Sequence, residues 1–266
     1  MVTVIGSDLR QKELARLLNK SYNTLYFDKS NDFDKIKNYI LVSEAVIFPY
    51  PFTKDEKTIN TTNYDISKTK EVIRSDCIVF GGDIEKYNIN QNTIDYGKDE
   101  LFLLKNALYT AESAIMLANQ NTKYSLNDLN ILIIGNGRIG KYLAKILSSY
   151  CKSITVSARK QKDFDYINKL LLKSIHTNKV DNLSEFDLVF NTVNQKALND
   201  SAINSIKKDA LIIDLASKNS GLLKEQGYID AKALPASFCS KSSAKALYDI
   251  IYKTLKSRWL IWIMSG

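Results

Sequence analysis

Short apolar runs alternate with amphipathic stretches along most of the chain. Residues 131–134 are Ile-Leu-Ile-Ile, a continuous apolar run typical of strands that are buried on both faces of a parallel sheet. The stretch that follows places Ile139, Leu143 and Leu147 on one face of a helix. An alternation of such strands and helices predicts an α/β fold with a parallel sheet.

The first 80 residues show one complete set of these elements. We predict strands at residues 2–5, 25–28, 45–48 and 77–80, and helices at residues 9–18, 32–42 and 66–73. The first turn, Gly6-Ser7-Asp8, lacks the further glycines of a dinucleotide-binding loop. This region is therefore predicted to be a small Rossmann-like unit that contacts a substrate or a partner.

The remaining residues show a second set of elements. We predict a strand or linking segment at 100–108, helices at 110–121, 139–147, 164–172, 197–206 and 242–259, and strands at 131–134, 154–156, 175–176, 187–193, 210–215 and 228–234. The expected fold has two Rossmann-like α/β domains, and the C-terminal one is a doubly wound parallel sheet. Residues 1–105 are expected to form the substrate or partner domain. Residues 106–266 are expected to form the dinucleotide-binding domain, with a linking helix and a closing C-terminal helix.

A glycine-rich turn separates the strand at 131–134 from the helix that follows it. It matches G-x-G-x-x-G and consists of Gly135, Asn136, Gly137, Arg138, Ile139 and Gly140. In such a loop the first glycine permits a tight turn, the second lets the backbone approach a pyrophosphate, and the third lets helix and strand touch. The helix N-terminus adds free N–H groups and the positive end of a dipole. We interpret the turn as a dinucleotide-binding loop, and a glycine-rich turn in another kind of α/β unit is the alternative.

The end of the next strand indicates which dinucleotide is bound. NAD-binding sites usually carry an acidic residue there, which holds the ribose 2′-hydroxyl. Here the sequence is Ser157-Ala158-Arg159-Lys160, so a hydroxyl is followed by two cations and a carboxylate is missing. This pattern suits a 2′-phosphate, and it favours NADP over NAD as the cofactor, although NAD is also considered. The alternative is that Arg159 stacks on the adenine or lies in solvent.

Polar residues follow two later strands of the same predicted sheet. Ligands of open α/β sheets bind beyond the carboxyl ends of the strands. We therefore expect the cofactor to contact Asn191, Thr192, Val193 and Ala216, with Asp214 and Ser217 as catalytic candidates and Lys218 as a candidate for a substrate carboxylate. The alternatives are strand-end caps and, for Lys218, an exposed lysine.

Two further pairs are candidates for contacts with the substrate. Thr110 and Glu112 begin a predicted helix that would face the cleft between the domains, where they would hold polar groups of the substrate as catalytic residues. The alternative is a helix-capping pair. Asp8 and Arg10 follow the first strand, and the Arg10 guanidinium matches a carboxylate in a bidentate manner. The alternative for this second pair is a salt bridge at the start of a helix.

Composition narrows the remaining classes of function. The net charge of the chain is +8, but the lysines are spread along the sequence without a dense basic block. No nucleic-acid partner is therefore expected. Three cysteines lie far apart without metal-ligand spacing, which predicts no metal site and fits a reducing cytoplasm. The apolar segment at 259–264 is too short to span a bilayer, so no membrane is expected. The only histidine, His176, is expected at the surface or beside the adenine rather than in catalysis.

Several of these motifs together resemble one family. They are Gly6 to Gln11, Thr110 to Ala118, the glycine loop with Arg138, Ala158-Arg159, Asn191-Thr192 and Asp214 to Ser217. The series resembles the A subunits of dipicolinate synthase from spore-forming bacteria. The resemblance implies a two-domain Rossmann protein that acts with a flavoprotein-like B subunit. It also implies NADP-dependent conversion of 4-hydroxytetrahydrodipicolinate, a dicarboxylate, to dipicolinate (pyridine-2,6-dicarboxylate) in the cytoplasm of the mother cell during sporulation.

The chain departs from the family pattern at several positions. Tyr109 and Ser113 stand where the family has proline and glycine, and Ser220 and Ala236 lie where it has glycine-rich stretches. Two other functions therefore stay open. One is a 2-hydroxyacid-type dehydrogenase, against which stands the lack of an Arg-Glu-His set. The other is a nucleotide-binding scaffold subunit that has lost its activity, which the altered glycine positions favour.

Overall fold

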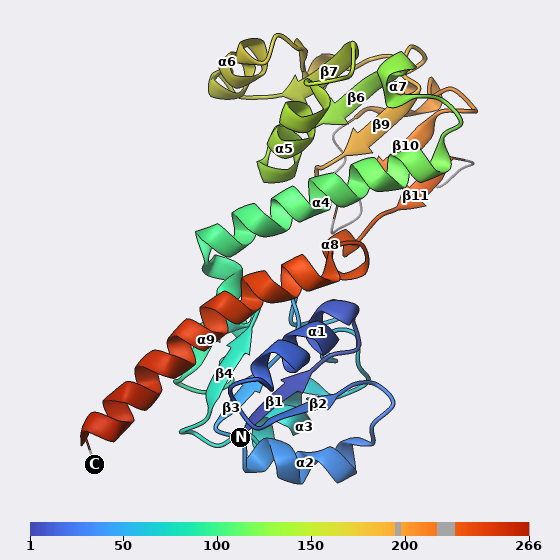
Figure 1. The fold of residues 1–266 in the computed structure, drawn as a ribbon. Coiled ribbons are helices and arrows are strands. Elements are labelled where there is room, and N and C mark those ends of the chain that lie inside the picture. The colour runs from blue at the N-terminus through green and yellow to red at the C-terminus, as the bar shows by residue number, and fades with distance from the viewer. Residues whose placement is uncertain (195–197, 217–226, 266) are drawn as a thin grey trace. The chain divides into compact units, whose positions relative to one another are not determined.

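The computed structural model of the chain describes residues 1–194, 198–216 and 227–265, with side chains up to residue 258. The chain forms two compact units (Figure 1). Unit 1 combines Met1–Asn106 with Pro235–Gly266, and unit 2 is Ala107–Leu234. Both units contain a parallel sheet, so the predicted class of two Rossmann-like α/β domains is confirmed.

The sheet of unit 1 has the strand order β2-β1-β3-β4-β5, and all its pairs are parallel. The strands are β1 (Val2–Ile5), β2 (Thr24–Phe27), β3 (Ala45–Ile47), β4 (Ile78–Gly81) and β5 (Thr93–Asp95). The helices are α1 (Leu9–Leu18), α2 (Phe33–Leu41), α3 (Ile66–Glu71) and α9 (Ser240–Ser265), with 3₁₀ turns at Glu85–Tyr87 and Tyr96–Lys98. No strand was predicted at the edge strand β5, whose side chains are only half-buried.

Helix α1 shows how local sequence defines these elements. Asp8 precedes its first turn in an extended conformation and accepts a hydrogen bond from the Gln11 amide at 2.8 Å, as an N-cap does. Leu14 and Leu18 are fully buried. The helix therefore starts where a carboxylate satisfies a free N–H group, and its apolar face packs into the core of unit 1.

Helix α9 belongs to unit 1, whereas the sequence analysis grouped it with residues 106–266. It packs on α1, and the rings of Tyr22 and Tyr252 lie 6.0 Å apart (Figure 1). Arg258 also donates a hydrogen bond to Asn92 beyond β4 at 3.0 Å. The physical reason is that the buried face of α9, which includes Leu255, is covered by residues far away in the sequence.

The sheet of unit 2 has the order β11-β10-β9-β6-β7-β8, again fully parallel. The strands are β6 (Asn130–Ile134), β7 (Ser153–Ala158), β8 (Lys173–His176), β9 (Leu188–Asn191), β10 (Leu211–Asp214) and β11 (Tyr228–Asp230). The helices include α5 (Arg138–Leu147), α6 (Gln161–Lys169) and α7 (Asp200–Asn204), with 3₁₀ turns at Leu126–Asp128 and Thr177–Lys179. The first strand of the unit, β6, lies between β7 and β9, so the strand order reverses at β6. This is the dinucleotide-binding topology, whose ligand site lies at the reversal.

Helix α4 (Glu100–Asn121) runs across the boundary between the two units, and the short helix α8 (Leu234–Ser237) precedes α9. The expected strand or linking segment at 100–108 was wrong, because no proline or glycine interrupts residues 100–121 and they form one helix. In the part of the chain that the structure describes, α4 alone is long and apolar enough to cross a membrane, a test that core helices also pass.

Candidate dinucleotide site

The glycine loop connects β6 to α5 at the point where the strand order of unit 2 reverses. Gly135 has a φ of +95°, a conformation that residues with a side chain rarely adopt. A Cβ atom at this position would also lie 2.7 Å from Cγ2 of Val193 and 2.8 Å from Oγ1 of Thr192. The first glycine is therefore required both by its backbone and by its neighbours.

The third glycine allows α5 to touch the loop. A Cβ atom on Gly140 would lie 2.1 Å from the carbonyl oxygen of Gly135, which is backbone and cannot rotate away. The second glycine differs, because a Cβ atom on Gly137 would meet no protein atom within 4 Å. The space in front of Gly137 is therefore open, as the approach of a pyrophosphate requires.

The open space lies at the N-terminus of α5. Gly137 is the N-cap residue, and no side chain among the described residues caps the helix there. The positive end of the helix dipole favours a negative charge at this position. The adjoining Arg138 is exposed and Ile139 is half-buried. These residues fit the diphosphate of a dinucleotide.

Thr192 supports the loop from β9. Its amide donates to the carbonyl oxygen of Ile134 at 3.0 Å, and its hydroxyl donates to the same oxygen at 2.9 Å. Both bonds hold the end of β6, where the glycine loop begins. Thr192 and Val193 therefore shape the loop through direct contact, in addition to any contact with a ligand.

Asn136 joins the loop to the start of α6. Its side-chain nitrogen lies 3.3 Å from a carboxylate oxygen of Asp163, and that oxygen lies 3.7 Å from the Lys141 ammonium group. The Asn136 side-chain oxygen is buried and lacks a hydrogen-bond partner among the described residues. The acidic side chain of this network, Asp163, comes from α6. The end of β7 carries no acidic residue.

Ser157 and the two cations that follow it differ in exposure to solvent. Ser157 is fully buried, and its hydroxyl accepts a hydrogen bond from the Gly135 amide at 3.2 Å and lies 3.2 Å from the Thr177 hydroxyl. It therefore fixes the loop from behind instead of facing a ribose. Arg159 and Lys160 are exposed, and in the described ranges no hydrogen bond or ion pair holds either side chain.

A buried carboxylate connects the ends of β9 and β10. The Asn191 side chain donates to Oδ1 of Asp214 at 2.8 Å, and the Ala216 amide donates to the same oxygen at 3.1 Å. The Tyr228 hydroxyl donates to Oδ2 at 2.6 Å. Asp214 is 2% exposed, so these donors offset the cost of burying its charge. Both oxygens of this carboxylate accept hydrogen bonds, and the catalytic role expected for Asp214 stays a prediction.

Two other expected site residues follow Asp214 closely. Ser217 and Lys218 lie outside the described residues. Ala216 is buried, and its amide is already bound to the Asp214 carboxylate. The structure therefore brings together the glycine loop, Asn191, Thr192, Val193, Asp214 and Ala216 at the strand ends of unit 2.

Thr110 and Glu112 do not form a pair. Both lie inside α4, so Thr110 is not a helix N-cap, and it is buried while Glu112 is exposed. Side chains two positions apart in a helix point in different directions. The capping pair that was the alternative is therefore excluded, because the helix begins ten residues before Thr110, and the contacts with a substrate stay a prediction.

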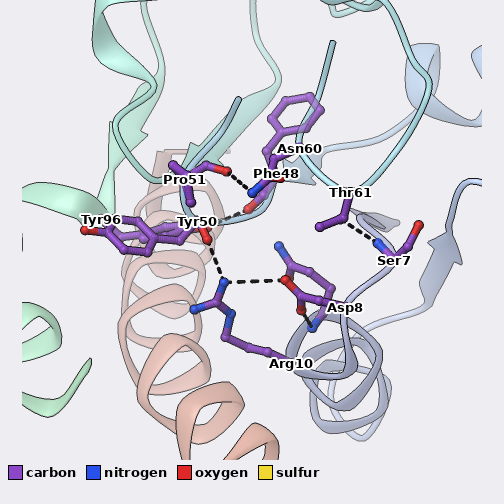
Figure 2. Close-up of polar contacts among 10 residues, drawn as sticks. Ser7, Asp8, Arg10, Phe48, Tyr50, Pro51, Asn60, Thr61 and Tyr96 are labelled. Carbon is purple, nitrogen blue, oxygen red and sulfur yellow. Dashed lines mark hydrogen bonds and ion pairs between the residues drawn. The ribbon is translucent and has the colours of Figure 1, made fainter. Parts of the chain in front are cut away.

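Asp8 and Arg10 come together in unit 1 (Figure 2). The Arg10 guanidinium donates to the carbonyl oxygen of Tyr50 at 2.7 Å and lies 3.5 Å from the Asp8 carboxylate. Arg10 is 3% exposed. The two residues therefore form the ion pair at the start of α1 that was the alternative, and the buried Arg10 guanidinium is also bound to the backbone.

His176 is engaged by residues outside the glycine loop. It accepts a hydrogen bond from the Asn178 amide at 3.3 Å, and its ring stacks on Phe164 with the centroids 6.3 Å apart. Across the described ranges, no group of three or more His, Cys, Asp and Glu side chains is arranged to hold a metal ion.

Sequence reasoning missed three residues that structure this region. Tyr228 binds Asp214, Thr177 binds Ser157, and Asp163 binds Asn136. Each contact joins segments separated by at least 14 residues, and none of the three lies in a recognised motif. Asp163 alone had a local signal, since it is an acidic residue in the first turn of the helix after β7.

The known proteins that this chain resembles include dehydrogenases. The family model of shikimate/quinate 5-dehydrogenase matches residues 116–218. The chain is 25% identical to the A subunit of dipicolinate synthase from Bacillus subtilis (strain 168), over 96% of this chain and 95% of that protein.

Solved structures show the same relationship. The A chain of dipicolinate synthase from Bacillus subtilis matches with a TM-score of 0.75 at 23% identity, over 96% of this chain and 95% of that one. The corresponding protein from Bacillus halodurans matches with a TM-score of 0.77 at 22% identity, over 96% and 97%. The apo-structure of D-lactate dehydrogenase from Escherichia coli matches with a TM-score of 0.60 at 14% identity, over 96% of both chains.

The similarity to these dipicolinate synthase proteins covers nearly the whole chain, so the resemblance inferred from the motifs is confirmed. The chain is a divergent relative of the A subunit of that enzyme. Its dehydrogenase-like fold and its glycine loop support an oxidoreductase-type protein with a nicotinamide dinucleotide as cofactor.

Proposed function

We propose that this chain is the NADP-dependent A subunit of a dipicolinate synthase, which converts 4-hydroxytetrahydrodipicolinate to dipicolinate during sporulation. The observation that carries the proposal is the open space at Gly137, at the uncapped N-terminus of α5. The similarity to the A subunit of dipicolinate synthase along nearly the whole chain supports the choice of reaction.

NADP is proposed over NAD on the basis of charge. Arg159 and Lys160 are exposed at the end of β7 and are not held by other side chains in the described ranges, so both are free to meet a 2′-phosphate. Asp163 opposes the binding of a 2′-phosphate, because its contact with Asn136 brings a negative charge to the loop. Lys141 lies 3.7 Å from the Asp163 carboxylate and reduces that opposition.

The proposed reaction removes water and two hydrogens from the substrate, the latter as a hydride and a proton. The bound coenzyme supplies the hydride acceptor, and formation of an aromatic ring favours the product. The chain has to hold the diphosphate at Gly137 and keep the strand ends of unit 2 in place, which is a positioning task. Asn191 and Asp214 serve that task through their 2.8 Å hydrogen bond.

The substrate contacts are proposed from residue chemistry. Arg10 is a candidate for binding a substrate carboxylate, with the Asp8 carboxylate 3.5 Å from its guanidinium, and Lys218 is a separate candidate for binding a carboxylate. Glu112 is an exposed carboxyl on α4 and is the candidate proton donor for the loss of water. Thr110 and Ser217 are proposed as hydroxyl contacts of the substrate.

The proposal includes a second protein chain. The Bacillus subtilis relative is one subunit of a synthase, so that protein acts with at least one other subunit. We propose that this chain likewise acts with a flavoprotein-like B subunit, in the cytoplasm of the mother cell of a spore-forming bacterium.

A scaffold that binds nucleotide without turnover is the second candidate. It is favoured by the state of Asp214, whose two carboxylate oxygens both accept hydrogen bonds, so this buried acid is not free to transfer a proton. A 2-hydroxyacid-type dehydrogenase is less well supported, since His176 is engaged with Phe164 and Asn178.

The decisive assay measures formation of the pyridine ring by its ultraviolet absorbance. The full chain is incubated with 4-hydroxytetrahydrodipicolinate and NADP, with and without the B subunit. Dipicolinate formation that requires this chain supports the proposal. Binding of NADP without turnover in either mixture supports the scaffold instead.

A further inference from the structure

The first turn of α1 contacts Tyr50 in unit 1. Tyr50 receives the Arg10 hydrogen bond on its carbonyl oxygen, and its ring lies so close to Gly82 that a Cβ atom there would be 2.0 Å from Cδ2 of Tyr50. The Tyr50 ring also meets Phe102 edge-on, with the centroids 5.3 Å apart. Arg10 lies beside Tyr50 (Figure 2), with its guanidinium carbon 6.0 Å from the centroid of the Tyr50 ring.

Three polar atoms in this turn have no hydrogen-bond partner among the residues that the structure describes. Nε of Arg10 is buried and unbonded, although another nitrogen of the same guanidinium is bound to Tyr50. Gln11 is fully buried, and both the nitrogen and the oxygen of its side-chain amide lack a hydrogen-bond partner among the described residues. Buried polar groups are almost always paired, and each unpaired one costs free energy.

The position of Gln11 is enforced by its neighbours. A Cβ atom on Gly6 would lie 2.9 Å from Cγ of Gln11 and 3.5 Å from the Thr61 hydroxyl. The Thr61 hydroxyl in turn accepts a hydrogen bond from the Ser7 amide at 2.8 Å. The Gln11 side chain therefore passes beneath the turn that follows β1, at the carboxyl end of the sheet, where ligands of parallel α/β sheets bind.

We propose that Arg10 and Gln11 form a subsite in unit 1 for a small organic acid whose carboxylate is flanked by an N–H or O–H group. The carboxylate accepts from Nε of Arg10 and from the Gln11 amide nitrogen. The flanking donor binds the Gln11 amide oxygen, which a carboxylate alone leaves unpaired. Asp8 does not contact the ligand, because its carboxylate caps α1 and steadies Arg10.

Access to this subsite requires movement of the segment that covers it. The three unpaired atoms are out of reach of solvent, and the covering segment between β3 and α3 carries both Tyr50 and Thr61. Two hydrogen bonds, from Arg10 to Tyr50 and from Ser7 to Thr61, hold that segment on the first turn of α1. Ligand entry therefore displaces one or both of these bonds.

The test compares three variants of the full chain. Gln11→Met keeps the length of the side chain and removes both unpaired polar atoms. Arg10→Lys keeps the charge and removes Nε. Lys12→Gln changes an exposed residue of the same turn and is the matched control. Pyridine-2,6-dicarboxylate and piperidine-2,6-dicarboxylate are titrated by calorimetry, the second because its ring N–H flanks both carboxylates. This inference rests on the proposed function only for the choice of these two diacids as probes.

We expect Gln11→Met and Arg10→Lys to weaken binding of the piperidine diacid at least about tenfold. We expect Lys12→Gln to bind as the wild type does. The unfolding temperature of Gln11→Met is expected to equal or exceed that of the wild type, since it loses two unpaired buried groups. Unchanged affinity in Gln11→Met overturns the subsite, and so does a wild-type chain that binds neither diacid.

A parallel titration with NADP separates this inference from the proposed function. Diacid binding that depends on Gln11, in a chain that takes up no coenzyme, leaves the subsite standing and removes the oxidoreductase proposal. Coenzyme binding without diacid binding removes the subsite alone.

Discussion

Gly140 lies so close to the loop before it that a Cβ atom at this position would be 2.1 Å from the carbonyl oxygen of Gly135. Helix α5 therefore touches the backbone of the loop that starts it, and this contact sets the direction in which the N-terminus of α5 points. The geometry of the proposed diphosphate site depends on this one approach.

Replacing Gly140 with alanine is expected to lower the free energy of unfolding by about 1–3 kcal/mol, because the added carbon forces the helix away from the loop. The affinity for coenzyme should fall with it. Lys145→Ala on the exposed side of α5 is the control and should change neither quantity. Chemical denaturation and coenzyme titration of both variants measure the effect, and a Gly140→Ala chain as stable as the control contradicts the contact.

Replacing Arg159 with aspartate is expected to weaken NADP binding about 10–100-fold and to improve NAD binding relative to it, since a cation at the end of β7 becomes an anion. Lys162→Asp makes the same change of charge at an exposed position in α6 and is the matched control. Fluorescence titration with both coenzymes gives the ratio. An unchanged ratio in Arg159→Asp would remove this residue from the 2′-phosphate site.

The hydrogen bonds to Asp214 predict a large cost for neutralising this carboxylate. Asp214→Asn should destabilise the chain by about 2–4 kcal/mol, because an amide nitrogen then faces a donor in the buried site. Tyr228→Phe should cost less, and the double variant should cost less than the sum of the two, since both changes act on one 2.6 Å bond. Asp230→Asn, at an exposed carboxylate, is the control. Additive effects in denaturation experiments would show that the two residues are not coupled.

The buried cysteines predict how stability depends on pH. Burial raises the pKa of the Cys77 thiol from 9.0 to about 11 and that of Cys151 likewise to about 11. The folded chain then holds protons that the unfolded chain releases, so their contribution to stability is complete below pH 9 and is lost between pH 9 and 11. The free energy of unfolding should fall across that range, and it should fall less steeply in Cys77→Ala than in Cys239→Ala. Equal slopes in the two variants would argue against a buried, protonated Cys77.

The sequence was sufficient to predict the order of most strands and helices in both units, because parallel strands buried on both faces leave continuous apolar runs such as 131–134. It also located the glycine loop, whose residue types are dictated by backbone conformation and close approach. The membership of α9 in unit 1 could not be predicted, since it depends on packing between Tyr22 and Tyr252, which are far apart in the chain.

The same limit applies to the candidate site. Ser157 and Asp214 were identified as polar residues at strand ends, but position alone did not show which way their side chains face. Their partners, Thr177 and Tyr228, come from other segments. The hydrogen bonds to these partners hold both polar side chains in the interior of unit 2. Helix α4 differs, because the lack of proline and glycine in residues 100–121 was a sequence signal for one continuous helix.

The central claim is that a nicotinamide dinucleotide binds with its diphosphate in front of Gly137. Gly137→Ala tests it directly, because the added carbon meets no protein atom within 4 Å and the backbone φ of −74° suits alanine. Titration of the full chain with NADPH, followed by nucleotide fluorescence, should show binding to the wild type and at least about tenfold weaker binding to Gly137→Ala, with an unfolding temperature within a few degrees of the wild type. Equal affinity in the two chains, or a wild type that binds neither NADPH nor NADH, would contradict the account.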